Sequence, residues 1–239
     1  MAIDNAEQLP EPATVGAVIV SAGASTRMAG VNKTLVELGG IPVIARTVEV
    51  FERCDAVGCV VVVVSQQSLA DVAEIARQRQ WKKVAHVRIG GVRRQDSVRI
   101  GLKALPEACR WIVVHDGARP LVTDKVIRDG LLTAQAVGAA TAAVPTVDTI
   151  KVVTDDGHVV ETLDRRKLAA IQTPQVFRRD LLLKAHDEIP DDVTDDASMI
   201  EIGGGRVEVF MGDRSNIKVT TPEDLVIAEA LLAARERGS

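Results

Sequence analysis

Short apolar runs alternate with longer amphipathic segments along most of this chain, and this alternation constrains the fold more than any other feature. Five runs have the near-continuous apolar character of strands that are buried on both faces. They are residues 15–20, 59–64, 84–89, 111–114 and 139–144. Strands separated by helix-length segments are typical of a mostly parallel sheet with helices on both faces. The sequence therefore predicts an α/β domain of the Rossmann-like type.

Helical signals fill the gaps between these strands. Pro42 suits a first helical turn, Ser68 and Thr123 suit helix starts, and residues 221–224 combine a cap, a first-turn proline and two carboxylates. The residues expected on the buried helix faces are Ile44, Val48 and Phe51; Leu69, Val72, Ala73 and Ala76; Val98, Leu102 and Leu105; and Ile127, Leu131 and Ala134.

Residues 145–173 interrupt the alternation. Two β-prone pieces, 149–153 and 158–162, are joined by Thr154-Asp155-Asp156-Gly157, in which the Asp-Gly pair is a strong hairpin signal. We interpret this segment as a β-arm that projects from the sheet. An isolated hairpin is unstable, so we expect the arm to lie on the domain or on a second subunit, and we predict a homodimer. The rest is expected to be one domain over residues 15–239, after a flexible tail over residues 1–14.

Composition excludes several classes of protein. The 29 Lys and Arg residues against 33 Asp and Glu give a net charge of −4, and there are three Phe, two Trp and no Tyr, which argues against nucleic-acid binding. The longest apolar stretch, residues 57–64, is too short to cross a bilayer, and the N-terminus lacks a secretory pattern, so we expect a cytoplasmic protein. The spacing of the three cysteines predicts neither a disulfide nor a metal site in the protein.

Polar residues follow the predicted strands, at the edge where parallel sheets bind ligands. In the first loop, Ser21-Ala22-Gly23-Ala24-Ser25-Thr26-Arg27-Met28, small residues allow backbone N–H groups to approach phosphates. Arg27 and Lys33 can neutralise charge that develops during phosphoryl transfer, although a glycine turn with two solvated cations is the alternative. In the second loop, Gly90 and Gly91 allow close approach to a base or ribose near Ser97, or simply form a turn before a basic helix start.

A third loop, His115-Asp116-Gly117-Ala118-Arg119-Pro120, places a carboxylate at the end of an apolar run. Asp116 can bind hydroxyl groups or assist a metal ion, and Arg119 can hold a phosphate; alternatively the two form an ion pair that stabilises the turn. Lys218 suits a phosphate, and Arg165 in the arm could reach one in its own subunit or across a dimer. The alternatives are an exposed strand lysine and a solvated basic run.

Taken in order, these motifs resemble the 2-C-methyl-D-erythritol 4-phosphate cytidylyltransferase family of the non-mevalonate isoprenoid pathway, from about residue 15 to residue 234. The resemblance rests on the Arg27 loop with Lys33, residues 90–97, residues 115–120, Thr173-Pro174-Gln175, Thr194-Asp195-Asp196-Ala197-Ser198, and residues 216–220 before Pro222-Glu223-Asp224. It implies a Rossmann-like nucleotidyltransferase domain. The implied reaction joins CTP and methylerythritol 4-phosphate to give 4-diphosphocytidyl-2-C-methyl-D-erythritol and pyrophosphate, with Mg²⁺ held mainly by the CTP phosphates.

The resemblance also implies roles for individual residues. Arg165 and Thr173 are expected to reach the substrate phosphate from the arm of the partner subunit. His115, next to Asp116, is not part of this implied set, and we interpret it as a neutral structural histidine. The residues implied for catalysis are Arg27, Lys33, Arg165 and Lys218; those for binding methylerythritol phosphate are Asp116, Arg119 and Thr173; and those for binding the nucleotide are Ala22, Gly23, Ala24, Gly91, Ser97 and Gly117.

The chain departs from the family pattern in places. Asn32-Lys33-Thr34 stands where the family commonly has Pro-Lys-Gln, and Ser215 replaces a frequent acid. Alternative functions are a ribitol 5-phosphate cytidylyltransferase, which shares the architecture, and a catalytically silent nucleotide-binding protein on the same fold. A sugar-1-phosphate nucleotidylyltransferase is a weaker alternative, because those chains usually carry a longer second domain.

Overall fold

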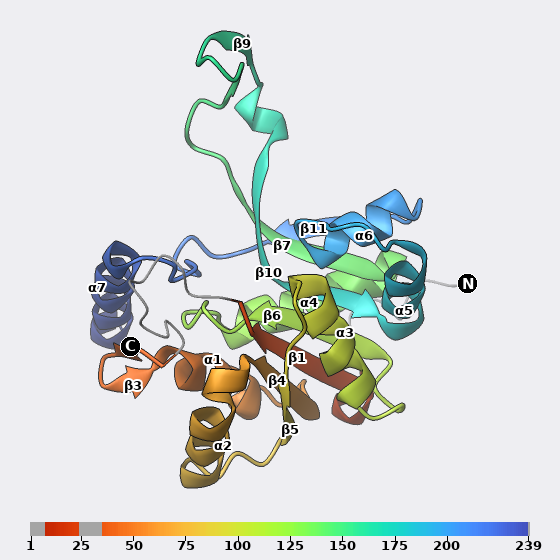
Figure 1. The fold of residues 1–239 in the computed structure, drawn as a ribbon, viewed down its shortest axis with the longest axis vertical. Coiled ribbons are helices and arrows are strands. Elements are labelled where there is room, and N and C mark those ends of the chain that lie inside the picture. Colours follow the sequence, from red (N-terminus) through yellow and green to blue (C-terminus); the bar gives the residue numbers. More distant parts are fainter. Residues whose placement is uncertain (1–7, 24–34, 239) are drawn as a thin grey trace.

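The computed structural model describes residues 8–23 and 35–238 of the chain (Figure 1). Within these ranges, a seven-stranded sheet forms the centre of the molecule, with the strand order β11-β7-β10-β6-β1-β4-β5. All its strands run parallel except β10, which lies antiparallel between β6 and β7. The strands are β1 (Val15–Ser21), β4 (Cys59–Val64), β5 (Val84–Ile89), β6 (Trp111–Asp116), β7 (Ala139–Pro145), β10 (Ala169–Arg178) and β11 (Glu208–Met211).

The five predicted strands are all present in this sheet. Two have the predicted bounds, and β1, β6 and β7 continue slightly further at their carboxyl ends. The sequence did not reveal β10 or β11. The middle of β10 contains Pro174 among polar residues, and such a run lacks the apolar pattern that identifies a buried strand.

Helices cover both faces of the sheet, and the alternating side chains of β1 divide the core in two. Ala17 and Ile19 belong to the apolar core beneath α1, α2 and α4, whereas Val18 and Val20 belong to the core beneath α3, α5 and α6. Helix α7 closes a third, smaller cluster around Val219. The helices are α1 (Val43–Arg53), α2 (Leu69–Gln78), α3 (Arg94–Ala104), α4 (Asp124–Val137), α5 (Arg179–Glu188), α6 (Asp196–Ile202) and α7 (Pro222–Gly238).

Most of the predicted helix features are confirmed. The expected apolar faces of α1, α3 and α4 are buried, the Thr123 side chain caps α4, and α7 begins at Pro222. The prediction for α2 was wrong in part, because Val72 is its buried residue while Ala73 is exposed, and the Ser68 side chain makes no cap hydrogen bond. Pro42 lies just before α1 in the short strand β3 (Ile41–Pro42), which pairs with β2 (Glu37–Leu38).

The predicted arm is a hairpin that stands away from the sheet (Figure 1). Strands β8 (Lys151–Val153) and β9 (Val159–Thr162) pair antiparallel, and Gly157 takes the positive φ of 86° that the turn requires. Every residue of both strands is exposed. The arm returns through a 3₁₀ turn, Arg165–Lys167, into β10.

Of the predicted tail, residues 1–7 lie outside the described ranges, and Pro12–Thr14 form a 3₁₀ turn before β1. The three cysteines, Cys54, Cys59 and Cys109, are free thiols. Among the helices in the described part of the chain, none combines the length and the apolar character needed to cross a membrane.

Candidate active site

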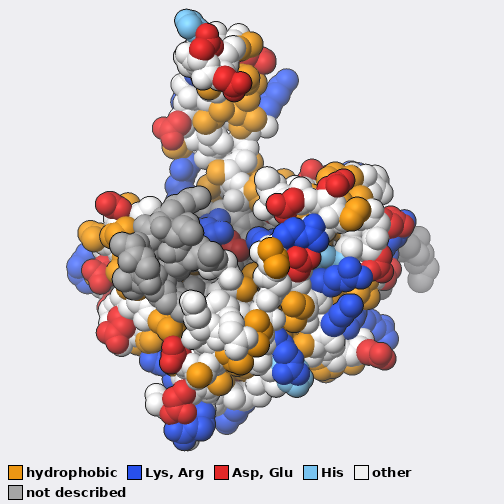
Figure 2. All heavy atoms as spheres, in the orientation of Figure 1, with side chains coloured by type: hydrophobic (Ala, Val, Ile, Leu, Met, Phe, Trp, Pro, Cys, Tyr) orange, Lys and Arg blue, Asp and Glu red, His pale blue; other side chains and the backbone are white. Residues whose placement is uncertain are grey.

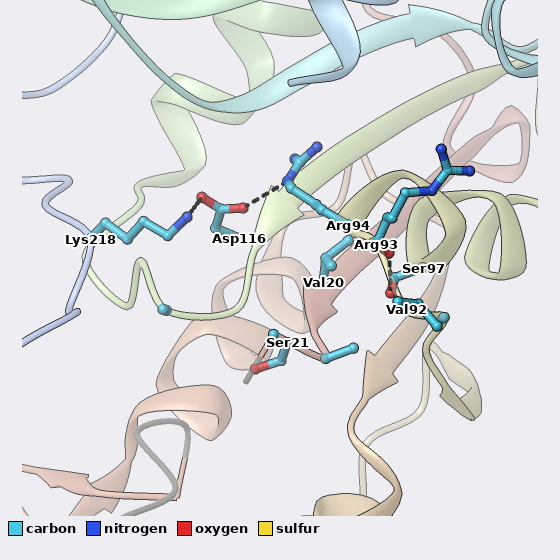
Figure 3. Close-up of a pocket in the computed structure, with 12 residues that line it drawn as sticks. Val20, Ser21, Val92, Arg93, Arg94, Ser97, Asp116 and Lys218 are labelled. Atoms are coloured by element: carbon cyan, nitrogen blue, oxygen red, sulfur yellow. Dashed lines mark hydrogen bonds and ion pairs between the residues drawn. The ribbon is translucent and has the colours of Figure 1, made fainter. Parts of the chain in front are cut away.

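A cavity lies beyond the carboxyl ends of β1, β5 and β6. Strands β4 and β5 lie on one side of β1 in the strand order, whereas β6, which comes later in the chain, lies on the other side of β1. The strand order therefore reverses between β1 and β6. Ligands of open α/β sheets bind at this kind of reversal point. The lining residues are Val20, Ser21, Ala22, Gly23, Gly91, Val92, Arg93, Arg94, Ser97, Asp116, Ala118 and Lys218 (Figure 3).

One side of the cavity consists of backbone and small side chains. Gly91 N donates to Ser97 Oγ at 3.1 Å, which holds the loop after β5 against the first turn of α3. A Cβ atom on Gly90 would lie 2.3 Å from the Ala22 side chain, so only glycine allows the loops after β1 and β5 to approach so closely. The predicted nucleotide residues Ala22, Gly23, Gly91 and Ser97 therefore lie together in one cavity.

The other side of the cavity carries a carboxylate surrounded by cations. Lys218 Nζ lies 2.9 Å from Asp116 Oδ2, and the Nε atoms of Arg94 and Arg119 each lie 3.5 Å from an oxygen of the same carboxylate. Burial alone would raise the pKa of Asp116, but the charges of these three cations outweigh burial and hold the pKa well below its usual range. Asp116 is therefore ionised at neutral pH.

A buried hydrogen-bond chain supports Asp116 from below. Asp116 N donates to Thr173 Oγ1 at 3.0 Å, Thr173 Oγ1 lies 3.1 Å from His115 Nδ1, and His115 Nε2 lies 3.2 Å from Arg119 O. The N–H of Asp116 can only donate, and the carbonyl of Arg119 can only accept. Thr173 therefore donates its hydroxyl proton to Nδ1 of His115, and the imidazole carries its own proton on Nε2. Burial lowers the pKa of His115 from 6.5 to about 4, as expected for a neutral structural histidine.

Strand β10 brings the distant motifs into contact with this chain of hydrogen bonds. Asn216 Nδ2 donates to Thr173 O at 2.8 Å, which fixes the segment before Lys218. Gln175 Nε2 donates to Asp195 Oδ2 at 2.6 Å, and Ala197 N donates to Gln175 Oε1 at 3.2 Å, which fixes the start of α6. These contacts build a second pocket that adjoins the first and shares Arg94, Asp116 and Lys218 with it.

The structure corrects the expected position of Thr173. This residue is buried on β10 beside Asp116 of its own chain, so it does not reach out on the arm. Arg165 does lie on the arm, exposed, with Nη1 donating to Val147 O at 2.7 Å, and it does not line the cavity of its own chain.

Gly117 does not line the described cavity either; it packs beneath it, where an added Cβ would lie 2.7 Å from Ile44 and 2.9 Å from Ser21. The remaining predicted site residues, Ala24, Arg27 and Lys33, lie outside the described residues.

Arg94 is a site residue to which the sequence analysis gave no role. Its position after Gly90 and Gly91 made it look like part of a basic helix start, and its two carboxylate partners are distant in sequence. The alternative offered for Asp116 and Arg119, an ion pair within the turn, is present, but Asp116 also contacts Lys218 and Arg94.

Comparison with known proteins identifies the family. The family model described as 2-C-methyl-D-erythritol 4-phosphate cytidylyltransferase matches residues 15–234. A curated protein of that name from Dehalococcoides mccartyi is 45% identical over 218 residues, covering 91% of this chain and 96% of the relative. The crystal structure of 4-diphosphocytidyl-2C-methyl-D-erythritol synthase from Anaerococcus prevotii matches with a TM-score of 0.82 at 28% identity, covering 92% of this chain and 96% of that one. This chain belongs to the 2-C-methyl-D-erythritol 4-phosphate cytidylyltransferase family.

Proposed function

We propose that this protein transfers the cytidylyl group of CTP to 2-C-methyl-D-erythritol 4-phosphate, giving 4-diphosphocytidyl-2-C-methyl-D-erythritol and pyrophosphate. One observation carries this assignment. A cavity bordered by glycine-rich backbone adjoins a pocket of polar side chains, and both share Asp116 and Lys218. The first suits the flat base, ribose and phosphates of a nucleotide, and the second suits a polyol phosphate.

The reaction needs alignment and charge neutralisation more than a protein nucleophile, because the attacking phosphate oxygen is already an anion. This oxygen forms a bond to the α-phosphorus of CTP, and the bond from that phosphorus to the bridging oxygen of the β-phosphate breaks, releasing pyrophosphate. The triphosphate oxygens would be the main ligands of Mg²⁺, and the bound ion would offset part of the triphosphate charge.

The described side chains divide this work between them. Lys218 and Arg119 bind the substrate phosphate, and the ionised Asp116 accepts hydrogen bonds from polyol hydroxyls. Lys218 and Arg119 both lie beside Oδ2 of Asp116, so an incoming phosphate would meet two cations that share one carboxylate oxygen. Arg27 and Lys33 complete the assignment as the cations that stabilise charge on the transferring phosphates.

Pyrophosphate release tests the assignment directly. The purified protein is mixed with Mg²⁺ and CTP and either methylerythritol 4-phosphate or ribitol 5-phosphate, with ATP, GTP and UTP as nucleotide controls. We expect release with CTP and methylerythritol 4-phosphate. Pyrophosphate release with ribitol 5-phosphate but not with methylerythritol 4-phosphate would mean that the protein is a cytidylyltransferase with a different substrate. CTP binding without pyrophosphate release in the presence of either polyol phosphate would indicate a catalytically silent nucleotide-binding protein.

We further propose that the protein is a homodimer in which each arm completes the partner's site. The arm stands away from its own sheet (Figure 1), and Figure 2 shows hydrophobic side chains on its surface. Its exposed apolar residues include Val147, Val153, Val159 and Val160. An exposed apolar hairpin is stabilised by a second surface. Arg165 near the base of the hairpin would then supply a cation to the polyol phosphate of the partner.

Subunit mixing tests this arrangement. Lys33→Ala and Arg165→Ala proteins are each expected to be nearly inactive alone. In a mixed dimer, the site with an intact Lys33 receives an intact Arg165 from the other chain, so mixing should restore activity. Light scattering establishes whether a dimer forms at all. A monomer, or a mixture no more active than its components, would contradict the shared site.

A further inference from the structure

The guanidinium of Arg94 bridges two carboxylates that belong to different parts of the fold. Arg94 Nη1 lies 2.6 Å from Oδ2 of Asp196 at the start of α6, and Arg94 Nε lies 3.5 Å from Oδ1 of Asp116 at the end of β6. Arg94 itself is the first residue of α3. It borders both the nucleotide cavity and the polyol pocket, so its side chain stands where the two substrates would meet.

The bridge determines how the Asp116 carboxylate is shared. Arg94 lies beside Oδ1 and Lys218 beside Oδ2 (Figure 3). Arg119 also lies beside Oδ2. Each oxygen therefore has its own cationic partner, which fixes the rotation of the carboxylate. Without Arg94, both oxygens would be free to turn toward Lys218 and Arg119 and would compete with a substrate phosphate for these cations.

Asp196 holds Arg94 in this position independently of any substrate. The Asp196 side chain is 1% exposed, and its ion pair with Arg94 compensates a carboxylate that would otherwise be buried without a cation beside it. The neighbouring Asp195 caps α6 by accepting from Ser198 N at 3.0 Å, which fixes the helix start that carries Asp196. Arg94 is thus anchored on one side and presents Nε on the other.

We propose that Arg94 is a positioning residue for methylerythritol phosphate: anchored on Asp196, it holds Oδ1 of Asp116, which orients this carboxylate toward the polyol and limits its pairing with Lys218 to Oδ2. This inference rests on the proposed function. It assigns Arg94 no direct role in binding CTP, so loss of Arg94 should weaken the binding of methylerythritol phosphate and leave the binding of CTP unchanged.

Arg94→Lys separates this role from folding. One ammonium keeps the ion pair with the buried Asp196 but cannot bridge to Asp116 at the same time, because lysine has a single nitrogen where arginine has a fork. We expect a melting temperature close to that of the wild type, a KM for methylerythritol phosphate raised about tenfold or more, and a KM for CTP within about twofold of the wild type.

Two further variants complete the experiment. Arg94→Gln combined with Asp196→Asn removes both charges, leaves no uncompensated buried carboxylate, and should show the same selective rise in KM. Arg99→Lys is the matched control, because Arg99 also lies on α3 and forms an ion pair with another helix, 2.6 Å from Asp187, but away from both pockets. It should leave both KM values unchanged.

Calorimetric titration with methylerythritol phosphate, in the presence of a non-reacting CTP analogue, gives a readout besides turnover and should show the same weakening. With an active wild type, unchanged binding and KM in both Arg94 variants would overturn the inference, as would an equal rise in the two KM values. A large loss of melting temperature in Arg94→Lys would also overturn it, because Arg94 would then act in folding. A wild type that neither turns over nor binds methylerythritol phosphate would instead refute the proposed function.

Discussion

Replacing Thr173 with valine should destabilise the protein and damage the site together. The threonine hydroxyl is buried, accepts from Asp116 N at 3.0 Å and donates to His115 Nδ1, 3.1 Å away. Valine has a similar shape but forms neither bond. The substitution therefore leaves one donor and one acceptor without partners in a part of the protein that water does not reach.

The expected loss follows from these two groups. Each buried polar group left without a partner costs about 1–3 kcal/mol, so the free energy of unfolding should fall by about 2–6 kcal/mol, with relaxation favouring the lower half of this range. Domains have total stabilities of about 5–15 kcal/mol, so this loss is a large fraction of the total. For a chain of this length it corresponds to a fall in melting temperature of about 5–20 °C.

Urea and thermal unfolding of Thr173→Val measure the loss, and Thr173→Ser is the control because serine retains the hydroxyl. The serine variant should stay within about 1 kcal/mol of the wild type, which reflects only the lost methyl group. If the valine variant is as stable as the wild type, or if both variants lose the same stability, the hydroxyl does not support Asp116 and the reasoning fails.

Two more predictions follow from the site. Burial keeps His115 neutral with a pKa of about 4 in the folded state, so the unfolded chain binds an extra proton below pH 6.5, and about 3 kcal/mol of stability should be lost as the pH falls from 6.5 to 4. The free energy of unfolding measured across this range should fall with falling pH, and the His115→Asn variant should show a smaller fall. An equal fall in the variant would contradict the conclusion that His115 is neutral in the folded state. Arg27→Ala and Lys33→Ala should each lower kcat by about 10²–10³-fold with little effect on CTP binding. A raised KM for CTP with unchanged kcat in steady-state kinetics would show that these residues do not stabilise the transition state.

Local patterns were sufficient to predict those parts of the fold in which the role of a residue is visible in its near neighbours. The apolar runs of β4 and β5, the cap at Thr123 and the Asp-Gly turn of the arm are all features of a few consecutive residues. The loops that follow β1, β5 and β6 could be assigned to one edge because parallel strands end at the same side of a sheet.

The missed features depend on contacts between segments far apart in the chain. Gln175 is polar and yet fully buried, because its amide binds Asp195 and Ala197 at the start of α6, and no pattern near Gln175 announces these partners. The role of Arg94 was likewise hidden, because its carboxylate partners, Asp116 and Asp196, come from β6 and α6. Thr173 was assigned to the arm for the same reason: its place on a central strand becomes evident only when β10 is paired with β6 and β7.

The direction of β10 explains why the arm and the site lie at the same edge of the sheet. Strand β7 runs parallel to β6, so its carboxyl end points to the ligand edge, and the arm begins there. Strand β10 is antiparallel, so the chain returns from the arm into the sheet at the same edge. The middle of β10 therefore carries Gln172, Thr173 and Gln175 to the site, while Val176 and Phe177 continue into the core. Two parallel strands can be joined only by a crossover, whereas an antiparallel strand can return at the edge where the preceding strand ended. Strand β10 therefore both supports Asp116 and carries the arm at the ligand edge of its own sheet.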